Sequence, residues 1–471
     1  MTPIRASSFA TRPDTIARLR KFGVRRAESS RITGFVIRIQ PAFPATKPRE
    51  RMPDITRPIG TTDILPSEAA RWQTVERFAR ETARLFHFRE IRTPLFEHTE
   101  LFHRGVGETT DIVSKETYTF TDRGGRSITL RPEGTAGVVR AVIENGLLND
   151  PGSVVKVYYL GPNFRYERPQ KGRLRQHHQF GAEAFGVAEP EMDVECMLLQ
   201  LAFYRRCGLK DLSLRINSLG DRESKHRYRD ALVAFLSPRR GELSEDSQRR
   251  LESNPLRILD SKDPRDVAAV RGAPPAEQSL SERSRAHFQR VQALLRSFGV
   301  PFEVDDGLVR GFDYYTDTLW EVTAGGLGSQ NAVGGGGRYD NLVEMLGGKP
   351  TPGVGFGSGL ERLLLALEAQ GVHLRAEAPK LVWLIAHGEA AKASNLLLLQ
   401  ELRSAGVAAD MDFTGRSVKS QFKLADREGA AWVVTVGDAE LTAGTVNLKN
   451  LHSGEQASLP RGELVARLVA S

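Results

Sequence analysis

Basic residues crowd into one stretch of the chain whose flanks have strand character. From Val154 to Gly186 the ends are rich in Val, Tyr and Phe, and one acid, Glu167, stands among five cations: Arg165, Arg168, Lys171, Arg173 and Arg175. This pattern predicts two β-strands joined by a long basic loop. Long loops in compact domains are frequently functional, so this hairpin is the first candidate for chemistry.

The alternation of side chains along a strand predicts which residues of this hairpin share a face. We expect Arg165 and Glu167 on one face of the first strand. We expect Gln179, Gly181 and Glu183 on one face of the second. A guanidinium, an amide and carboxylates around a glycine gap suit a zwitterion beside a polyphosphate. For a charged hairpin taken alone, a solvated surface is the alternative interpretation.

Two glycine-rich stretches follow further along the chain. Residues 334–337 are all glycine, and glycines alternate from Gly353 to Gly359. The first is not followed by Gly-Lys-Ser/Thr and opens no GxGxxG helix, which excludes a P-loop and a Rossmann fingerprint. A flexible surface loop is its alternative. Alternating glycines leave one strand face bare, as a flat ring lying on it would need.

Arg362 occupies the first turn of a helix expected over residues 360–369. A cation at that position opposes the helix dipole unless an anion lies nearby. Its placement therefore indicates a bound phosphate.

Composition limits the class of protein. The 471 residues allow two or three domains with real cores. Cys196 and Cys207 form no CxxC pair, which disfavours structural zinc and a disulfide framework and fits a reducing cytoplasm. No apolar run approaches the eighteen or so residues of a membrane span.

The net charge of +8 is unevenly distributed along the chain. Residues 1–51 hold twelve basic and three acidic residues, so the remainder carries a net charge of −1. Contact with a polyanion must therefore rest on local patches such as the 165–175 loop, not on a global field.

Residues 1–52 are expected to form a basic, disordered N-terminal extension. An Arg- and Ser-rich leader is also typical of an organelle transit peptide. We favour a third interpretation, translation from upstream of the natural start at Met52, because Met-Pro-Asp-Ile-Thr leads directly into organised sequence. Peptides from residues 1–51 in the native protein would exclude that interpretation.

Periodicity and turn residues predict the elements that must position these groups. Ser67 is a candidate cap for a helix containing Trp72, Val75, Ala79 and Phe86. Further helices are expected at 136–145 and 191–207. Strands are expected at 89–102 with Pro94 inside, in a hairpin over 118–130, and at 212–217, 302–304, 308–316 and 319–322.

The remaining sequence divides into a helical and an α/β part. Residues 221–300 are Arg- and Glu-rich with several prolines, which predicts a helical insertion. After a linker at 376–379, strands at 381–386, 407–411, 432–436 and 445–448 alternate with helices at 389–404, 417–429 and 460–470. This predicts an independent α/β domain of about a hundred residues.

Together, these stretches resemble one known family. The hairpin with Arg165 followed by Glu-Arg-Pro-Gln-Lys-Gly-Arg resembles motif 2 of the class II aminoacyl-tRNA synthetases. Gly355 to Arg362 is similar to motif 3, and residues 89–102 are similar to the weaker motif 1. Residues 308–315 and 336–340 resemble the two histidine-binding signatures of the histidyl-tRNA synthetases. The resemblance covers about residues 55–471 and departs at Ile59, where the family usually has Arg.

The resemblance implies an α+β fold. Its core would be a six- or seven-stranded antiparallel sheet flanked by helices, in a catalytic domain over residues 53–375 with the helical insertion at about 221–300. Residues 380–471 would be an anticodon-binding domain. A homodimer would form largely through the motif 1 region.

The activity implied by the resemblance is ATP-dependent formation of histidyl-adenylate from L-histidine, then transfer to the 3′ end of histidine tRNA. ATP would arrive with magnesium as a substrate complex, without a tightly bound cofactor or zinc. The protein would be cytoplasmic, with no membrane or DNA partner. The substrate carboxylate, with a pKa near ~3.5, is already ionised, so no protein nucleophile is needed. Catalysis then consists of placement and charge stabilisation.

The resemblance also assigns roles to arginines. Arg165 would hold the α-phosphate and the histidine carboxylate, and Arg362 the γ-phosphate, with Arg173 as a further ATP contact. Arg310 would neutralise charge growing on the α-phosphate, which makes it the first choice as catalytic residue together with Arg165. The tRNA acceptor end would meet Arg168, Gln170 and Lys171.

Histidine itself would contact a second group of residues: Glu133, Gly134, Thr135, Arg165, Gln179, Glu183, Arg310, Tyr314, Tyr315 and Tyr339. Within it, Glu133, Thr135 and Gln179 would surround the α-amino group. Glu183, with Tyr314 and Tyr315, would read the imidazole, which has one donor and one acceptor nitrogen. Core packing is the alternative for the two tyrosines. For Lys419 and Lys423, candidate phosphate contacts one helix turn apart, a solvated helix face is equally compatible.

Two alternative functions remain at this level. One is a non-catalytic, synthetase-like regulatory subunit of the first enzyme of histidine biosynthesis, which the retention of Arg165, Glu183, Arg310, Arg362 and the last domain disfavours. The other is a class II synthetase for glycine, threonine or proline, which Glu183 and the Tyr314-Tyr315 pair disfavour.

Overall fold

The computed structural model describes residues 55–470 apart from 108–109, 151, 329–330 and 375–379. The expected extension at 1–52 and the expected linker at 376–379 lie outside the described residues. The α+β class expected from the sequence is confirmed by the sheets and helices below.

The larger sheet has eight strands in the order β1-β5-β6-β11-β10-β9-β7-β8 among the described residues. Their bounds are β1 Arg89–Glu90, β5 Val155–Phe164, β6 Gln176–Phe185, β7 Leu212–Ser218, β8 Glu303–Val304, β9 Thr316–Ala324, β10 Ala332–Arg338 and β11 Gly353–Gly359. The six inner strands pair antiparallel, as expected, and the two-residue edge strands β1 and β8 add a parallel pair at each side.

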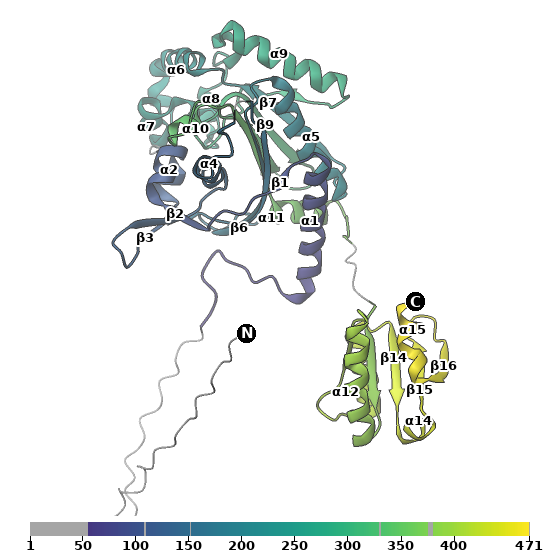
Figure 1. Ribbon diagram of the computed structural model, residues 1–471. Helices are drawn as coiled ribbons and strands as arrows, with labels where there is room; N and C mark the ends of the chain where they lie inside the picture. The colour runs from purple at the N-terminus through teal and green to yellow at the C-terminus, as the bar shows by residue number, and fades with distance from the viewer. Residues whose placement is uncertain (1–54, 108–109, 151, 329–330, 375–379, 471) are drawn as a thin grey trace, which may run out of the picture. The chain divides into compact units, whose positions relative to one another are not determined.

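The two faces of this sheet bury different residues. Tyr158, Phe180 and Ala182 pack into one core, whereas Val157 and Tyr159 pack into another. Because side chains alternate along a strand, the cores lie on opposite faces. The first core includes α1 (Pro66–Leu85), α5 (Pro190–Arg206), α9 (Glu282–Ser297) and α11 (Leu360–Ala369), with α1 and α5 next to each other (Figure 1). The second includes α4 (Thr135–Glu144), α6 (Arg222–Leu236) and α10 (Leu342–Met345).

The start of the chain's first helix differs from the sequence expectation. Leu65, not Ser67, is the N-cap of α1, and Pro66 is the first helical residue. Proline favours that position because its fixed φ suits a helix and its missing N–H would be unpaired there anyway.

The expected strand over residues 89–102 was wrong in most of its length. Only β1 and β2 (Phe96–His98) are strands, and α2 (Thr99–Val106) begins directly after them. Phe102, Gly105 and Val106 are all buried, and a helix places positions i, i+3 and i+4 on one side, whereas a strand would point Gly105 and Val106 to opposite faces. The predicted hairpin is confirmed as β3 (Tyr118–Thr121) and β4 (Ser127–Leu130), which form a three-stranded sheet with β2. The short helix α3 (Asp111–Lys115) precedes it.

The segment over residues 308–315 was also predicted as a strand, and this was wrong. It forms turns between β8 and β9. The Asp305 side chain accepts the Gly307 N–H at 3.0 Å, and the Asp305 carbonyl accepts the Leu308 N–H at 2.9 Å. Such local bonds compete with a strand ladder.

The glycine run is not a surface loop. Gly334 to Gly337 lie inside β10, which pairs with β9 on one side and β11 on the other. The strand of alternating glycines, β11, and the helix that follows it, α11, are confirmed with the predicted bounds.

Residues 221–300 are helical, as predicted. After α6 come η1 (Ser237–Glu242), α7 (Glu245–Ser253), η2 (Pro255–Ile258), α8 (Pro264–Ala269), η3 (Ala276–Ser279) and α9. Leu236, Leu243 and Leu251 form a small core with Ile258 and Ala269. In contrast, α9 packs against α5 within the core of the large sheet.

Residues 381–470 form their own sheet, in the order β13-β12-β14-β15-β16. Its elements are β12 (Val382–Ala386), α12 (Glu389–Ser404), β13 (Ala409–Met411), α13 (Val418–Arg427), β14 (Trp432–Val436), α14 (Asp438–Ala443), β15 (Thr445–Asn450), β16 (Gln456–Pro460), η4 (Arg461–Glu463) and α15 (Leu464–Val469). The predicted α/β alternation is present, but the sequence analysis missed α14 and β16. Within the described part of the chain, no helix is both long and apolar enough to span a membrane.

Candidate active site

A cavity of about 780 Å³ opens on the face of the large sheet that carries Tyr159. Ten of the predicted site residues line it: Glu133, Thr135, Arg165, Arg173, Gln179, Arg310, Tyr314, Tyr315, Tyr339 and Arg362. They come from β6, the loop before it, the start of α4, the end of β10, α11 and the turns before β9, which the chain brings together from positions more than two hundred residues apart.

Five predicted residues do not line this cavity, and one of them, Glu183, lies just beneath it. Gly134 is covered by the Tyr159 ring, because a Cβ built on it would lie 2.3 Å from Tyr159 Cε2. Arg168, Gln170 and Lys171 are exposed on the loop between β5 and β6.

Glu183 lies just beneath the cavity and is almost fully buried. Its carboxylate accepts hydrogen bonds from the hydroxyls of Thr135 at 2.8 Å, Tyr159 at 3.3 Å and Tyr339. Burial raises the pKa of this carboxyl to about 8, although the three hydroxyls oppose the rise. The acid expected to read the substrate ring is therefore held by neutral donors in a dry environment.

Glu133 is the second buried acid of the site. Its carboxylate accepts the backbone N–H groups of Thr135 and Ala136, the latter at 2.9 Å, at the start of α4. Burial raises its pKa, and the two backbone donors lower it. The helix start thus fixes the direction of the carboxylate, and an ionised carboxylate still has lone pairs for another donor.

Glycines in the two central strands make room for charged side chains. A Cβ on Gly355 would lie 1.7 Å from Glu183 Oε2, and a Cβ on Gly335 would lie 1.5 Å from the Arg310 guanidinium. Real side chains cannot approach so closely, so the charged groups lie over bare backbone. A ring lying on the alternating glycines of β11 stays a prediction, and of these glycines Gly355 faces the Glu183 carboxylate.

Arg165 does not lie on a strand face as expected. β5 ends at Phe164, and the Arg165 N–H donates to the Arg175 carbonyl at 2.8 Å where the loop begins. Its Nε donates to the Pro132 carbonyl at 2.9 Å, which aims the guanidinium along the wall of the cavity. Glu167 also lies in the loop, with an oxygen 4.0 Å from the Arg165 guanidinium.

The other arginines of the cavity are similarly held by protein oxygens. Arg310 donates to the Trp320 carbonyl and to Glu321 at 3.3 Å, and Arg362 donates through Nε to the Ala332 carbonyl. Burial and the neighbouring Arg173 lower the pKa of Arg362. Among the described residues, no atom accepts a hydrogen bond from the buried Nε of Arg310. Several cations thus face one cavity, as an anionic ligand would require.

The two adjacent tyrosines are buried, yet they line the cavity. Tyr314 stacks on Phe312 with ring centroids 5.2 Å apart and meets Tyr339 edge-on at 5.6 Å. The Arg165 guanidinium lies over the Phe312 ring at 5.7 Å. Core packing and exposure to the cavity, weighed as alternatives in the sequence, are both present.

Sequence reasoning missed Tyr159 and His177, which also line the cavity. Tyr159 pairs with Gly181 in the hairpin register, and a Cβ on that glycine would lie 2.2 Å from the tyrosine ring. The position opposite a glycine was the signal that would have indicated Tyr159. Burial, with the nearby Arg165, lowers the pKa of His177 to about 3, so its imidazole is neutral.

The insertion contributes a further group of lining residues that the sequence did not indicate: Arg257, Leu259, Asp260, Ser261 and Lys262. Nothing in their local pattern distinguishes them from other charged helix ends. Among the described residues, no cluster of three or more His, Cys, Asp or Glu side chains is arranged to hold a metal ion.

Comparisons with known proteins agree on one family. A family model described as histidyl-tRNA synthetase matches residues 60–363, and one described as an anticodon-binding domain matches residues 382–471. The chain is 51% identical over 401 residues to a histidine–tRNA ligase of Anoxybacillus flavithermus (85% of this chain, 95% of the relative). It is 52% identical over 410 residues to that of Moorella thermoacetica (87% of this chain, 97% of the relative).

Solved structures give the same result. The crystal structure of apo S. aureus histidyl-tRNA synthetase matches with a TM-score of 0.76 at 39% identity, covering 88% of this chain and 100% of that one. A Bacillus halodurans structure titled ATP phosphoribosyltransferase regulatory subunit/histidyl-tRNA synthetase matches with a TM-score of 0.59 at 22% identity, covering 83% of this chain and 100% of that one. At that identity the match shows the fold alone.

Proposed function

The chain belongs to the histidyl-tRNA synthetase family, and from this membership we propose how its own residues carry out the reaction. The protein is a class II histidine–tRNA ligase, which uses ATP to charge histidine tRNA with histidine. The assignment of individual residues to steps is the proposal.

In the first step the histidine carboxylate attacks the α-phosphorus of ATP. A bond forms between a carboxylate oxygen and that phosphorus, and the bond to the bridging oxygen breaks, so that pyrophosphate leaves with the electron pair. Arg165 holds both the α-phosphate and the attacking carboxylate, and Arg362 with Arg173 holds the far end of the triphosphate. A planar guanidinium suits such paired oxygen contacts better than an ammonium does.

Arg310 stabilises the charge that grows on the α-phosphate. Its place on the cavity wall and its position over bare Gly335 support this role, because the protein holds the guanidinium beside the space that the ligand would occupy. Each protein contact of Arg310 leaves part of the guanidinium fork for the phosphate.

The amino acid is selected by the buried acids. Glu133, Thr135 and Gln179 bind the α-amino group. Glu183 faces one imidazole nitrogen, and the hydroxyl of Tyr314 or Tyr315 faces the other. The wrong amino acid would leave buried polar groups unpaired, which discriminates strongly. The three hydroxyls that hold Glu183 support this reading, since they fix the direction of the carboxylate.

The remaining partners follow from the same membership. ATP enters as its magnesium complex, with the ion bound mainly through phosphate oxygens. The exposed Arg168, Gln170 and Lys171 meet the tRNA acceptor end through phosphates and base edges. We place the catalytic domain at residues 53–375 and the anticodon-binding domain at 380–471, in a cytoplasmic homodimer.

The meeting of Arg165, Arg310 and Arg362 with two buried glutamates around one cavity carries this proposal. Its test is ATP–pyrophosphate exchange with each amino acid in turn, followed by aminoacylation of histidine tRNA. We expect exchange with histidine alone. Exchange with glycine, threonine or proline would redirect the proposal to another class II synthetase. Histidine binding without exchange would favour the regulatory subunit.

A further inference from the structure

The two tyrosines that face the substrate cavity are fastened from behind by the helical insertion. Lys225 lies in the first turn of α6, and its Nζ donates to the carbonyls of Asp313 at 2.9 Å and Tyr315 at 3.1 Å. These two carbonyls stand on either side of Tyr314. One ammonium therefore fixes the peptide groups that direct both tyrosine side chains.

The surroundings of this ammonium are unusual for a lysine. Burial lowers the pKa of Lys225, and the charge of Asp313 opposes that effect only in part. A buried charged donor lowers stability unless it is hydrogen-bonded, so the ammonium requires the two carbonyls as acceptors. The carbonyls in turn would lose these hydrogen bonds without the ammonium. Asn254, at the end of α7, adds a bond from its Nδ2 to Asp313 Oδ1 at 2.9 Å.

A second cavity also borders Tyr314. It has a volume of about 630 Å³ and is lined by Lys225, Asn254 and Met345 among others, and Tyr314 lines both it and the substrate cavity. Tyr314 thus borders two spaces. Phe312 and Tyr339 pack against its ring, and the bonds from Lys225 hold the peptide groups from which the ring projects.

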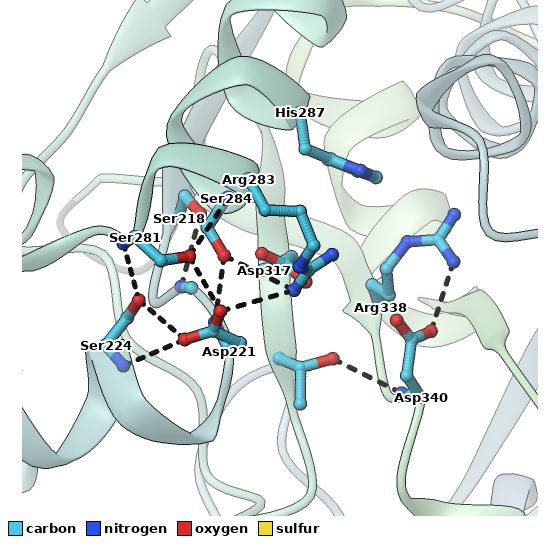
Figure 2. A network of polar contacts seen from close by, with 12 residues as sticks. Ser218, Asp221, Ser224, Ser281, Arg283, Ser284, His287, Asp317, Arg338 and Asp340 are labelled. Carbon is cyan, nitrogen blue, oxygen red and sulfur yellow. Dashed lines mark hydrogen bonds and ion pairs between the residues drawn. The ribbon is translucent and has the colours of Figure 1, made fainter. Parts of the chain in front are cut away.

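Hydrogen bonds also hold the starts of α6 and α9 together, close to the strand that follows the two tyrosines. Figure 2 shows the polar cluster where α6 and α9 begin: Asp221, Ser224, Ser281, Ser284, Arg283 and Asp317. The Asp221 carboxylate caps α6 by accepting the Ser224 N–H at 2.9 Å, and it also accepts a hydrogen bond from the Ser281 hydroxyl at 2.7 Å. The Ser224 hydroxyl in turn accepts the Ser281 N–H at the start of α9 at 2.8 Å. The two helix starts satisfy each other's unpaired groups.

Asp317 joins this cluster to β9, two residues after Tyr315. Its N–H donates to the Gly220 carbonyl at 2.8 Å, its carbonyl accepts the Leu219 N–H at 2.9 Å, and its carboxylate accepts Arg283 at 2.8 Å. Asp317 has a φ of +39°, which a non-glycine residue adopts only where surrounding bonds impose it. The base of α6 is therefore held in a fixed register with the tyrosines.

We propose that Lys225 is a positioning residue of the amino acid pocket: its ammonium holds the carbonyls on either side of Tyr314 and so sets the direction of the rings that meet the substrate. This inference rests on the proposed reading of the histidine ring by Tyr314 and Tyr315. It assigns to the insertion a part in amino acid recognition.

The test compares Lys225→Met with Arg285→Met, which removes a cation from an exposed position in the first turn of α9. In ATP–pyrophosphate exchange, Lys225→Met is expected to raise the KM for histidine about tenfold or more, the size expected from losing hydrogen bonds of a charged donor. The KM for ATP should stay within about twofold. Arg285→Met should match the parent in both. Lys225→Arg, which keeps the donors, should recover part of the loss.

Further measurements separate positioning from general damage. Equilibrium dialysis of L-histidine without ATP should show the same weakening in Lys225→Met. In a double-mutant cycle with Tyr314→Phe, the two losses should be less than additive, because they act through one side chain. A histidine KM unchanged in a folded Lys225→Met protein, equal rises in both KM values, or full additivity would overturn the inference.

The tyrosine variants test the underlying assignment independently. If Tyr314→Phe and Tyr315→Phe leave the KM for histidine unchanged with Lys225 intact, the proposed reading of the ring fails, and the inference built on it is overturned as well. If those variants weaken histidine binding while Lys225→Met does not, only the role of Lys225 is rejected.

Discussion

The Tyr339 hydroxyl donates a hydrogen bond to the Glu183 carboxylate inside the sheet face that carries the cavity. Burial holds the pKa of Glu183 at about 8 in the folded protein, far above the ordinary value for a glutamate. Between the two values the folded state binds a proton that the unfolded chain has released. The stability contributed by this group therefore falls as the pH rises from about 4.5 to about 8.

Glu183→Gln keeps the shape but cannot ionise. The unfolding free energy of the variant minus that of the parent should increase between pH 5 and pH 8, by at most about 1.4 kcal/mol per pH unit. Above pH 8 this difference should become constant. Urea denaturation of both proteins at pH 5, 6.5, 8 and 9 measures it. Parallel stability profiles would contradict the raised pKa.

Arg310→Ala is expected to lose adenylate formation while retaining histidine. Removing one preorganised donor typically costs ~10²–10³ in rate, so ATP–pyrophosphate exchange should fall by that factor. Equilibrium dialysis should find histidine bound nearly as in the parent. Arg205→Ala, at the exposed end of α5, is the matched control. Near-normal exchange in Arg310→Ala would refute the role.

Gly355→Ala tests whether the bare strand is needed for the buried acid. The new methyl group would meet Glu183 Oε2 at 1.7 Å and the Ala182 carbonyl at 2.5 Å, so something must shift. Overpacking typically costs about 1–3 kcal/mol, and because the strain falls on the acid that binds the substrate, we expect the KM for histidine to rise by about 5- to 140-fold. Gly241→Ala, which meets no atom within 4 Å, should have no effect. An unaltered KM for histidine in Gly355→Ala would show that the acid has room to move.

Arg338→Met tests the buried ion pair behind the pocket. Arg338 donates to Asp193, and both side chains are fully buried. Burial alone would raise the pKa of Asp193, but Arg338 and His287 hold it below its ordinary value. Removing the guanidinium leaves the buried carboxylate with only His287 and Thr318, and breaking a buried ion pair typically costs about 3–5 kcal/mol in unfolding free energy.

The exposed pair Arg290–Glu191 provides the comparison for that experiment. Arg290→Met should cost below about 1 kcal/mol, since water already screens that pair. Equal losses in the two variants, measured by denaturant unfolding, would contradict the importance assigned to burial at Arg338.

Sequence patterns predicted the elements whose periodicity is long and uninterrupted. The central hairpin, β11 with α11, and the long helix α12 appear where alternation or helical spacing indicated them. Prediction was wrong where a tertiary contact or a local side-chain bond decided the conformation. The helix that begins at Thr99 buries Phe102, Gly105 and Val106 on one side, as a strand could not, and residues 308–315 turn because Asp305 binds the backbone ahead of it.

The site was predicted where a family motif or a strand register indicated it. The same reasoning passed over Tyr159, because a tyrosine within a strand resembles any core aromatic until its glycine partner is paired with it. Lys225 was equally hidden. A lysine on a charged helix gives no sign that two carbonyls nearly ninety residues away will surround it.

The bare backbone of Gly335 and Gly355 limits how this protein can change its substrate. A glycine has no smaller replacement, so no substitution at these two positions can enlarge the cavity for a bulkier amino acid. Any larger residue there collides with Arg310 or Glu183. Redesign toward another amino acid must therefore begin in the turns before β9 and in α6, which donates hydrogen bonds to them.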